Sequence, residues 1–541
     1  MAIRKFRIDN IQGGISDTFY DQSLISYTGS LGIDPDLPVR PVSLSIPKTS
    51  GQIMPSAYAK FSGTEVDGYP LWIVTQPKTE NSFVYTTTGD LHSFDNTLVM
   101  RATDEAGTAF PIVFTGGAGN GLNYYNNFIY VMEGADVSQY GGMDQGASIA
   151  ETENVWTGAK FGKAALTNTT YPTIRATALP NHPGHVHQDN ALYFGDVIPA
   201  GFATLSSRGR GTLHKLQTKQ TTIQGDTDDG SIYGAVLLPF GYVPTDIESL
   251  PNGDLAIACI QSSGSSSPII NQGVAAVFFW DTFQDIPYRQ IECPDPIITA
   301  LKNVNGSLYV FSGSSVSGSR VSRLGTYSME EVAFFEEGVS PFAGAVDALG
   351  QKITFGGYTT YPNNSVSVFA IGSKKSSIPE ALHNIAATTS TGSNGVVTSL
   401  KYVQQNIFKI PQLVIGWGDD SAKGLDKFSS SGTILSSFRK VFPIGSGFQI
   451  QRLVVGLTES VTSNVSITPK FFIDNESSSV TLTAINNTNY PDQVEVVYKN
   501  TDLKSVRGSN NFSVSFQWGS TQPAGIAYFE VWADIIEDEK A

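Results

Sequence analysis

The stretch Asn305 to Phe311 (NGSLYVF) decides the fold. An Asn-Gly pair tolerates the positive φ angles of a tight hairpin turn. The residues that follow the pair are largely apolar or aromatic, so the strand they form is expected to be covered on both faces. A single hairpin does not supply two covering layers. The stretch therefore predicts a fold in which sheets stack on each other.

The same arrangement recurs along the chain. Further turns rich in Asn, Asp or Gly lead into the strands Leu71 to Val74, Phe128 to Met132, Ala191 to Gly195, Leu255 to Cys259 and Lys352 to Gly356. The copies are about 45 to 65 residues apart, near the length of one four-stranded propeller blade with its loops. A blade that is apolar on both faces needs a neighbour on each side, so the ring must close. Six copies predict a β-propeller of six blades, or of seven if the N-terminus or residues 78–100 supply another.

The whole chain is predicted to be all-β, in four segments. These are an extended N-terminal arm (1–50), the β-propeller (51–385), a linker (386–400) and a C-terminal β-sandwich (401–541). Strands after residue 400 alternate apolar and polar residues, which is typical of a sheet with one buried face.

Two segments interrupt this pattern of short strands. Asp34 to Pro41 is rich in proline and predicts an extended arm that binds a neighbouring subunit or completes a blade. Ser377 to Ala387 (SIPEALHNIAA) is the best candidate for a short helix, with Pro379 near its first turn.

Composition narrows the class of protein. Only 15% of the 541 residues are charged, whereas an ordinary soluble domain has roughly 25%. The formal net charge is -15, which disfavours general binding to nucleic acid. Met1 to Asn10 lacks the apolar core of a signal peptide, and no run approaches the roughly 20 apolar residues of a membrane span. We expect a soluble chain that is made in a cytoplasm.

Three of the six histidines, His182, His185 and His187, lie within the segment NHPGHVH. Three imidazoles so close together are candidate ligands for Zn²⁺, Ni²⁺ or Cu²⁺. Their spacing matches no motif with a known mechanism, and the alternative is a polar loop that leads into a blade strand. Cys259 and Cys293 are expected to be free, buried thiols, although one bridge between them stays open.

Other patterns that suggest chemistry are incomplete. Asp226, Asp228 and Asp229 resemble a calcium loop, but Gly230 stands one position too early and a bidentate Glu is missing, so a solvated turn is expected. The run Gly116 to Gly121 is followed by a strand, not by the helix that a phosphate site needs. No nucleophile elbow or carboxylate pair stands out. The sequence therefore predicts no enzyme, no catalytic residues and no cofactor.

These motifs together resemble a family. Gly13 to Asp17 (GGISD), Asn305 to Phe311, and Ala345 to Asp347 just before Lys352 to Gly356 are similar to tailed-bacteriophage virion proteins that carry a β-propeller, of the tail-nozzle or tail-hub type. The resemblance covers residues 6–372.

The resemblance implies a non-enzymatic structural protein that is located in the virion. It would form a homo-oligomeric ring of six subunits and contact other tail or head-tail connector proteins. DNA would leave through the acidic channel of this ring without specific binding. The alternative is a receptor-binding, carbohydrate-binding or carbohydrate-cleaving propeller protein that acts in host adsorption.

Overall fold

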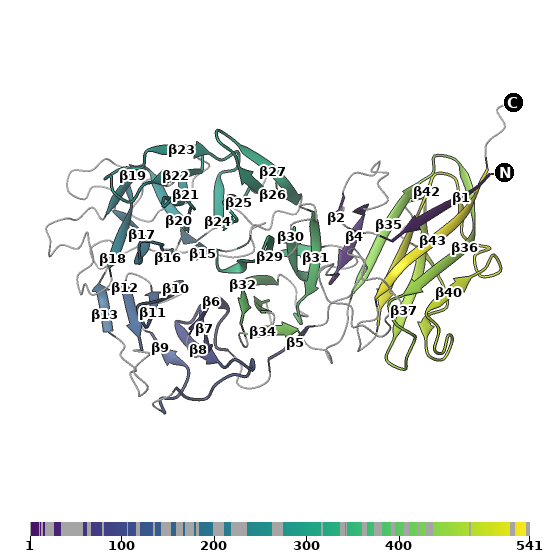
Figure 1. Cartoon of the computed structure of the whole chain (residues 1–541), viewed down its shortest axis with the longest axis horizontal. Helices are drawn as coiled ribbons and strands as arrows, with labels where there is room; N and C mark the ends of the chain where they lie inside the picture. The colour runs from purple at the N-terminus through teal and green to yellow at the C-terminus, as the bar shows by residue number, and fades with distance from the viewer. Residues whose placement is uncertain are drawn as a thin grey trace.

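The computed structural model shows a β-propeller joined to a β-sandwich (Figure 1). It describes residues 2–9, 11, 14–16, 26–33, 58–61, 66–77, 80–104, 107–114, 119–133, 136–141, 153–157, 166–167, 178–179, 183–198, 210–217, 235–261, 274–314, 318–335, 341, 343–359, 365–372, 381–390, 395–404, 411–419, 422–428, 436–474, 478–519 and 525–536.

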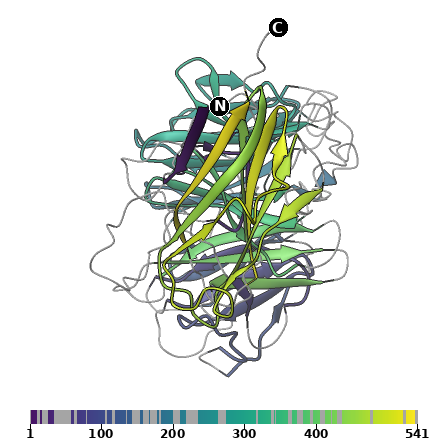
Figure 2. The same cartoon turned by 90° about the vertical axis from the view of Figure 1, so that its right-hand side faces the viewer.

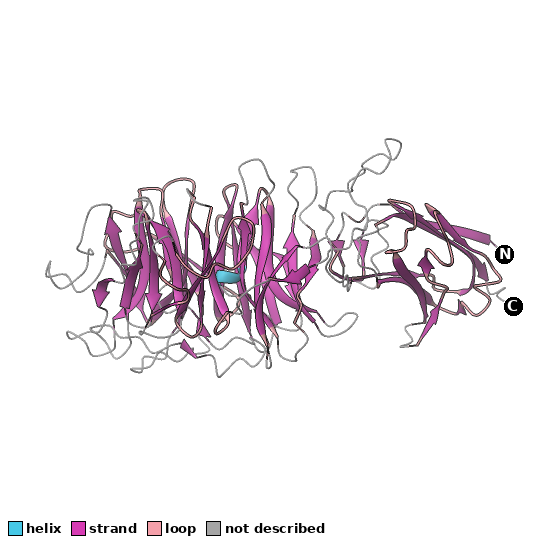
Figure 3. Cartoon of the chain, turned by 90° about the horizontal axis from the view of Figure 1, so that it is seen from below, coloured by secondary structure: helices cyan, strands magenta, loops and turns pink. Residues whose placement is uncertain are grey.

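Seven four-stranded antiparallel sheets form the blades, which stand side by side when the ring is seen edge-on (Figure 3). Blade one comprises β6 (Pro70–Thr75), β7 (Ser82–Thr86), β8 (Asp90–Phe94) and β9 (Ile112–Val113). Blade two comprises β10 (Gly119–Tyr125), β11 (Phe128–Glu133), β12 (Asp136–Tyr140) and β13 (Glu153–Thr157). Blade three comprises β16 (Gly184–Val186), β17 (Ala191–Ile198), β18 (Arg210–Gln217) and β19 (Val236–Phe240). Blade four comprises β20 (Tyr242–Ser249), β21 (Leu255–Gln261), β22 (Ala276–Trp280) and β23 (Arg289–Glu292).

Blade five comprises β24 (Ile297–Val304), β25 (Ser307–Ser314), β26 (Gly318–Leu324) and β27 (Met329–Phe335). Blade six comprises β28 (Val346–Leu349), β29 (Lys352–Thr359), β30 (Ser365–Ile371) and β31 (Leu382–Ala387), and a 3-10 helix (Ala343–Ala345) precedes it. Blade seven comprises β32 (Val396–Val403), β33 (Gln412–Gly418), β34 (Lys423–Phe428) and, from the N-terminal part of the chain, β5 (Tyr58–Lys60).

The recurring apolar strands are the second strands of their blades. β11, β17, β21, β25 and β29 contain five of the six copies, while the weaker copy lies in the innermost strand β6. In β21 every residue from Leu255 to Ile260 is buried. The turn before β25 has a φ of 50° at Asn305 and 87° at Gly306, as the Asn-Gly pair predicts. The propeller fold is thus confirmed, with seven blades.

Blade seven carries no such turn signal, because β33 follows a proline and not an Asn-Gly pair. It closes the ring by pairing β34 with β5, where Lys427 stands opposite Ala59. Its apolar residues pack on blade one in a shared core that includes Val414, Leu425, Ile73 and Val84. The propeller therefore extends to residue 428, and the boundary expected at 400 is wrong.

Two further expectations differ from the structure. Within the segment expected to be a helix, Leu382–Ala387 forms the outer strand β31, because Ile385 and Ala386 are buried against blade seven. Within the expected linker, residues 396–400 belong to the innermost strand β32. Local helix propensity and polar composition predict secondary structure weakly, and pairing with an open sheet edge overrides them here.

The sandwich consists of two sheets, whose C-terminal strands begin at residue 437. The first runs β1 (Ala2–Ile8), β43 (Ile526–Ile536), β36 (Gly447–Leu457), β40 (Glu495–Tyr498), with β41 (Arg507–Gly508) also on β36. The second runs β38 (Ser479–Thr481), β37 (Ser466–Ile473), β42 (Asn511–Trp518), β35 (Ser437–Pro443), β4 (Gly29–Leu31), with β39 (Ile485–Asn486) also on β37. Two small sheets join β2 (Gly14–Ile15) to β3 (Ser26–Tyr27) and β14 (Leu166–Thr167) to β15 (Ala178–Leu179).

Two strands in the described parts of the expected arm, β1 and β4, belong to the sandwich, while β2 and β3 form a small sheet of their own. β1 pairs with β43 along its full length, and β4 pairs with β35. The proline-rich run 34–41 lies outside the described residues. Of the two roles expected for the arm, the completion of a blade is performed by β5, which lies just beyond it.

The sandwich contacts blade six of the propeller, and the propeller lies behind it in Figure 2. The Tyr27 hydroxyl is 2.8 Å from Nδ1 of His383, and the two rings are 5.8 Å apart. The backbone N–H of Ile33 donates to the carbonyl of Asn384 at 2.8 Å. Since Tyr27 also packs on Phe438, the N-terminal segment connects the sandwich core to blade six.

Phe512→Ala should destabilise the sandwich by about 3–5 kcal/mol, because large-to-small changes leave a cavity. The Phe512 ring is fully buried and lies 4.9 Å from that of Phe442 and 5.3 Å from that of Phe448. Urea unfolding followed by tryptophan fluorescence measures the loss. The matched control is Phe283→Ala, at a side chain that is 89% exposed, where we expect a change within about 0.5 kcal/mol. Equal losses in the two variants would contradict this packing.

Candidate functional site

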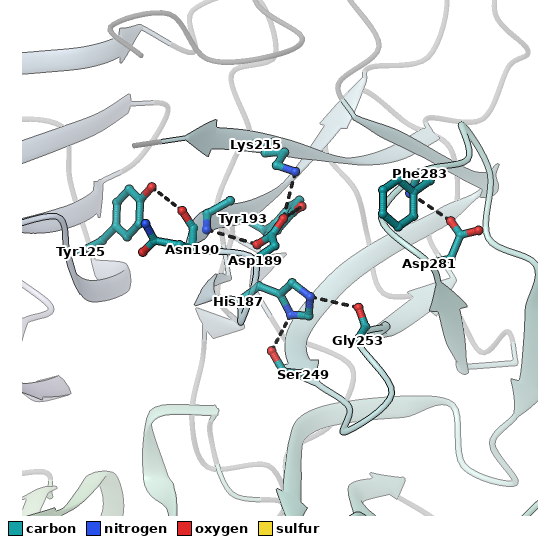
Figure 4. Close-up of polar contacts among 11 residues, drawn as sticks. Tyr125, His187, Asp189, Asn190, Tyr193, Lys215, Ser249, Gly253, Asp281 and Phe283 are labelled. Atoms are coloured by element: carbon teal, nitrogen blue, oxygen red, sulfur yellow. Dashed lines mark hydrogen bonds and ion pairs between the residues drawn. The ribbon is translucent and has the colours of Figure 1, made fainter. Parts of the chain in front are cut away.

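His185 and His187 converge on one serine between blades three and four. Nε2 of His185 and Nδ1 of His187 each lie 2.7 Å from Oγ of Ser249, at the end of β20. Figure 4 shows His187 between Ser249 and Gly253. Nε2 of His187 lies 3.0 Å from the carbonyl oxygen of Gly253. His182 lies outside the described residues. The structure thus brings together two of the three candidate ligands.

We call His185, Ser249, His187 and the Gly253 carbonyl the histidine relay. Its hydrogen-bond partners determine which atom donates at each step. The Gly253 carbonyl only accepts, so Nε2 of His187 carries the proton and its Nδ1 accepts from the Ser249 hydroxyl. That hydroxyl has no second proton, so Oγ accepts from Nε2 of His185. Burial lowers the pKa of His185 to about 3 and also lowers the pKa of His187. Both imidazoles are therefore neutral at physiological pH.

The geometry of the two histidines favours a structural role over a role as metal ligands. Both ring nitrogens of His187 are used by protein partners. Among the described residues, no three His, Cys, Asp or Glu side chains gather closely enough to hold a metal ion. The pair therefore fastens blade three to blade four.

The turn after His187 is held by its own polar contacts. Oδ2 of Asp189 accepts from the Tyr193 hydroxyl at 2.7 Å and lies 2.9 Å from Nζ of Lys215. Burial works against ionisation of Asp189, but the bonds from Lys215 and Tyr193 outweigh it and lower the pKa of this carboxyl. The Tyr125 hydroxyl of blade two donates to the Asn190 carbonyl at 2.8 Å (Figure 4). This turn links blades two and three.

A chain of ion pairs connects the innermost strands of blades four to seven. Nζ of Lys302 on β24 is 4.0 Å from a carboxylate oxygen of Glu248 on β20 and 3.6 Å from one of Asp347 on β28. Nζ of Lys401 on β32 is 3.5 Å from the same oxygen of Asp347. Burial opposes ionisation of Asp347, but Lys401 and Lys302 outweigh it and lower its pKa. Each of these four charged side chains thus has a partner on a neighbouring blade.

Two aspartates on these strands also accept a backbone N–H from the next blade. Oδ2 of Asp246 accepts from Leu301 N at 2.7 Å, and Oδ2 of Asp347 accepts from Tyr402 N at 2.8 Å. In both cases donor and acceptor are 55 residues apart. Burial raises the pKa of Asp246 to about 7, with a smaller contribution from Glu248. Asp246 therefore titrates near neutral pH in the folded protein.

Exposed apolar side chains gather at the outer edges of blades four and five. The exposed fractions are 89% for Phe283, 56% for Ile286, 49% for Tyr288 and 91% for Tyr327. We call these four residues the rim surface. Scattered single apolar residues are common on proteins, but large aromatic residues grouped on neighbouring loops mark interaction sites.

The loop that carries the rim surface is held firmly from within. Oδ1 of Asp281 accepts from the backbone N–H groups of Phe283 and Gln284, each at 3.0 Å, and these bonds lower the pKa of its carboxyl. Thr282 between them has a φ of 65°, a conformation that costs a β-branched residue energy. The Trp280 indole N–H donates to the Gln284 carbonyl. These bonds hold the loop in a conformation in which the Phe283 ring is exposed.

Neighbouring blades hold the same loop from both sides. On blade three, the backbone N–H of Leu237 donates to the carbonyl of Asp285 at 2.8 Å. On blade five, the carbonyl of Thr326 accepts from the Arg289 guanidinium, so the turn with Tyr327 lies beside the loop. Residues of three blades therefore hold the rim surface in place.

The buried histidine relay supports the rim surface. His187 holds the Gly253 carbonyl in the turn before β21, and Gly253 itself has a φ of 95°. The next residue, Asp254, accepts a hydrogen bond from the Tyr288 hydroxyl. Burial and this bond raise the pKa of Tyr288 to about 12, so its hydroxyl stays protonated as a donor.

The sequence did not single out the rim residues, because an aromatic residue in a loop has no pattern that separates exposure from burial. Of the other candidates, Asp226, Asp228 and Asp229 lie outside the described residues. Cys259 and Cys293 are buried thiols that are not joined in a disulfide, as expected. Burial raises the pKa of the Cys293 thiol to about 11.

Ser249→Ala should cost about 1–3 kcal/mol, because it leaves a ring nitrogen of each histidine without its partner. Chemical denaturation at pH 7.5 measures the loss. Ser249→Thr keeps the hydroxyl and serves as the matched control, with a smaller loss expected. Equal stability of the alanine variant and the wild type would contradict the relay.

Asp246→Asn should flatten the pH dependence of stability. The folded pKa of about 7 lies above the unfolded value near 4, so Asp246 weakens the folded state progressively between pH 4 and 7. With allowance for solvent near the axis, the variant should gain about 1–2 kcal/mol on the wild type between pH 5 and pH 8. Urea unfolding at both pH values tests this. A constant difference between the two proteins would contradict it.

Comparisons with known proteins add little beyond the fold. No protein-family model matches the chain, and no curated protein matches it in sequence. Among solved structures, the WD40 domain of Pan2 from Neurospora crassa is similar over 69% of this chain and 96% of its own length, with 12% sequence identity and a TM-score of 0.39. No helix in the described residues has the length and apolar character needed to cross a membrane. The assignment as a β-propeller rests on the strand pairing of the seven blades.

Proposed function

We propose that this chain is a non-enzymatic structural protein of a bacteriophage virion, a ring-forming tail component of the nozzle or hub type. The observation that carries the proposal is the rim surface, a fixed group of exposed aromatic and aliphatic side chains on the outer edges of two blades. Aromatic residues of this kind form the centres of protein–protein interfaces. The bacteriophage context comes from the sequence resemblance.

The polar interior of the propeller supports a role as a rigid body. Glu248, Lys302, Asp347 and Lys401 connect four blades through ion pairs, and the histidine relay connects blade three to blade four. Each of these side chains fastens one blade to another. A rigid ring of blades keeps a docking surface in one geometry, which lowers the entropic cost of assembly.

In this proposal DNA passes between the subunits of the ring, not along the axis of one propeller. Along that axis, blades four to seven are joined by charged side chains that hold one another. The chain has a net charge of -15, and in this proposal its channel surface is acidic on balance, so that DNA would move past it without sticking. The remaining partners would be other tail or head-tail connector proteins.

The purified chain should assemble into rings, and we expect six subunits in each ring. Light scattering measures the mass, and negative-stain imaging shows the particles. DNA binding at physiological salt should be weak. A monomer at all concentrations that releases sugar from host polysaccharide would contradict the proposal and favour host adsorption.

A further inference from the structure

We propose that strands β1 and β4 of one copy complete the sandwich of the next copy. This inference rests on the proposed function, since it names the contact that builds the ring. Three observations carry it. They are the burial of the N-terminal residues in the sandwich, the two places that the chain connects after β4, and the length and composition of that connection.

The sandwich is incomplete without the N-terminal residues. β1 pairs with β43 over seven residues, and β4 pairs with β35 over three. Without the N-terminal segment the core would be open to water, so such a segment from some copy of the chain must fill it. Strand pairing and core packing are the same whether the segment comes from the same copy or from another. Five of its apolar side chains lie in the sandwich core: Phe6, Ile8, Ile11, Tyr27 and Ile33.

The N-terminal residues also fit closely against blade six. The backbone N–H of Ile33 donates to the carbonyl of Asn384 at 2.8 Å. Gly14 has a φ of 67°, and a Cβ atom at this position would lie 2.5 Å from the carbonyl oxygen of Leu382. A donated segment would therefore bind both the sandwich and blade six of the receiving copy.

The connection from the sandwich to β5 starts and ends on adjacent blades of one copy. It comprises residues 34–57, which we call the spacer and which lie outside the described residues. Before the spacer, Ile33 is bonded to β31 of blade six, and after it, Tyr58 stands opposite Phe428 of blade seven. These two blades pack on each other in a shared core. Packed sheets lie about 10 Å apart, and connections between neighbouring elements usually have about 4–6 residues, so a short connection would suffice within one copy.

The spacer is much longer than such a connection requires. It has 24 residues, and an extended chain of this length spans about 80 Å. Proline-rich spacers favour extended conformations of about 3.1 Å per residue, so the sequence predicts a semi-rigid link and not a compact loop. Length and composition therefore favour a spacer that bridges two copies. Five of its residues are prolines: Pro35, Pro38, Pro41, Pro47 and Pro55.

The exchange would link the copies head to tail. Each copy gives its N-terminal segment to one neighbour and receives that of the other neighbour, so the two contacts of a copy use different surfaces. Contacts of this kind close into a ring or continue as a filament. Because the exchanged side chains are buried and apolar, assembled rings should withstand salt that would weaken a contact between charged surfaces.

Disulfide trapping between β1 and β43 tests the exchange. Ile3 is 65% exposed and stands directly opposite Asp534, so Ile3→Cys with Asp534→Cys places two cysteines on paired strands. Cys259 and Cys293 are buried, so mild oxidation of assembled rings should link only the introduced pair. On denaturing, non-reducing gels we expect most of the protein at multiples of the mass of one chain, and reduction should return it to single chains.

The matched control is Arg323→Cys with Glu330→Cys, a pair that stands opposite on neighbouring strands of blade five. It should link within one chain and run at the mass of a single chain. Two results would overturn the inference and leave the proposed function standing. They are Ile3/Asp534 links confined to single chains in intact rings, and an unlinked Ile3/Asp534 pair beside a linked control. A wild-type chain that stays monomeric at all concentrations would overturn both.

Discussion

The pairing of β34 with β5 is the interaction on which the propeller depends. Every blade is apolar on both faces, so an open row of blades would expose two sheets to water. The strand Tyr58–Lys60 joins the end of the row to the N-terminal part of the chain. It thereby holds Val414 and Leu425 of blade seven against Ile73 and Val84 of blade one. Closure buries the last two apolar faces at once and makes the blades one cooperative body.

The same N-terminal segment also completes the sandwich, and this makes the two units depend on each other. β1 and β4 are edge strands of its two sheets, and Tyr27 between them lies against His383 of blade six. The chain thus leaves the sandwich, passes blade six, closes the propeller and returns to the sandwich at residue 437. Such crossing connections restrict the relative movement of the two units.

The chain has few charged residues, and several of them link neighbouring blades. Asp246 and Asp347 cap backbone N–H groups of the next blade, and Lys302 and Lys401 balance the carboxylates between them. Burying these charged groups costs desolvation free energy, so they add little net stability. They specify how the blades are arranged, because a mispaired blade would leave a charge without a partner. The low charge fraction of the chain reflects an all-β body whose turns use Asn, Gly and Ser. In the proposed ring, neighbouring copies would cover part of its apolar surface.

The fold class and the position of five blades could be predicted, because a turn pair followed by a doubly buried strand is a local signal that stacking requires. Asn305-Gly306 before β25 is an example. Blade seven, the strand at Leu382–Ala387 and the sandwich role of residues 2–8 could not be predicted in this way, since each depends on a partner far along the chain. The sequence by itself determined a ring of stacked sheets and the acidic balance of the chain. Only the tertiary structure decided that His185 and His187 meet at Ser249 and that Phe283 and Tyr327 stand exposed together, because exposure and proximity are set by long-range packing and not by local pattern.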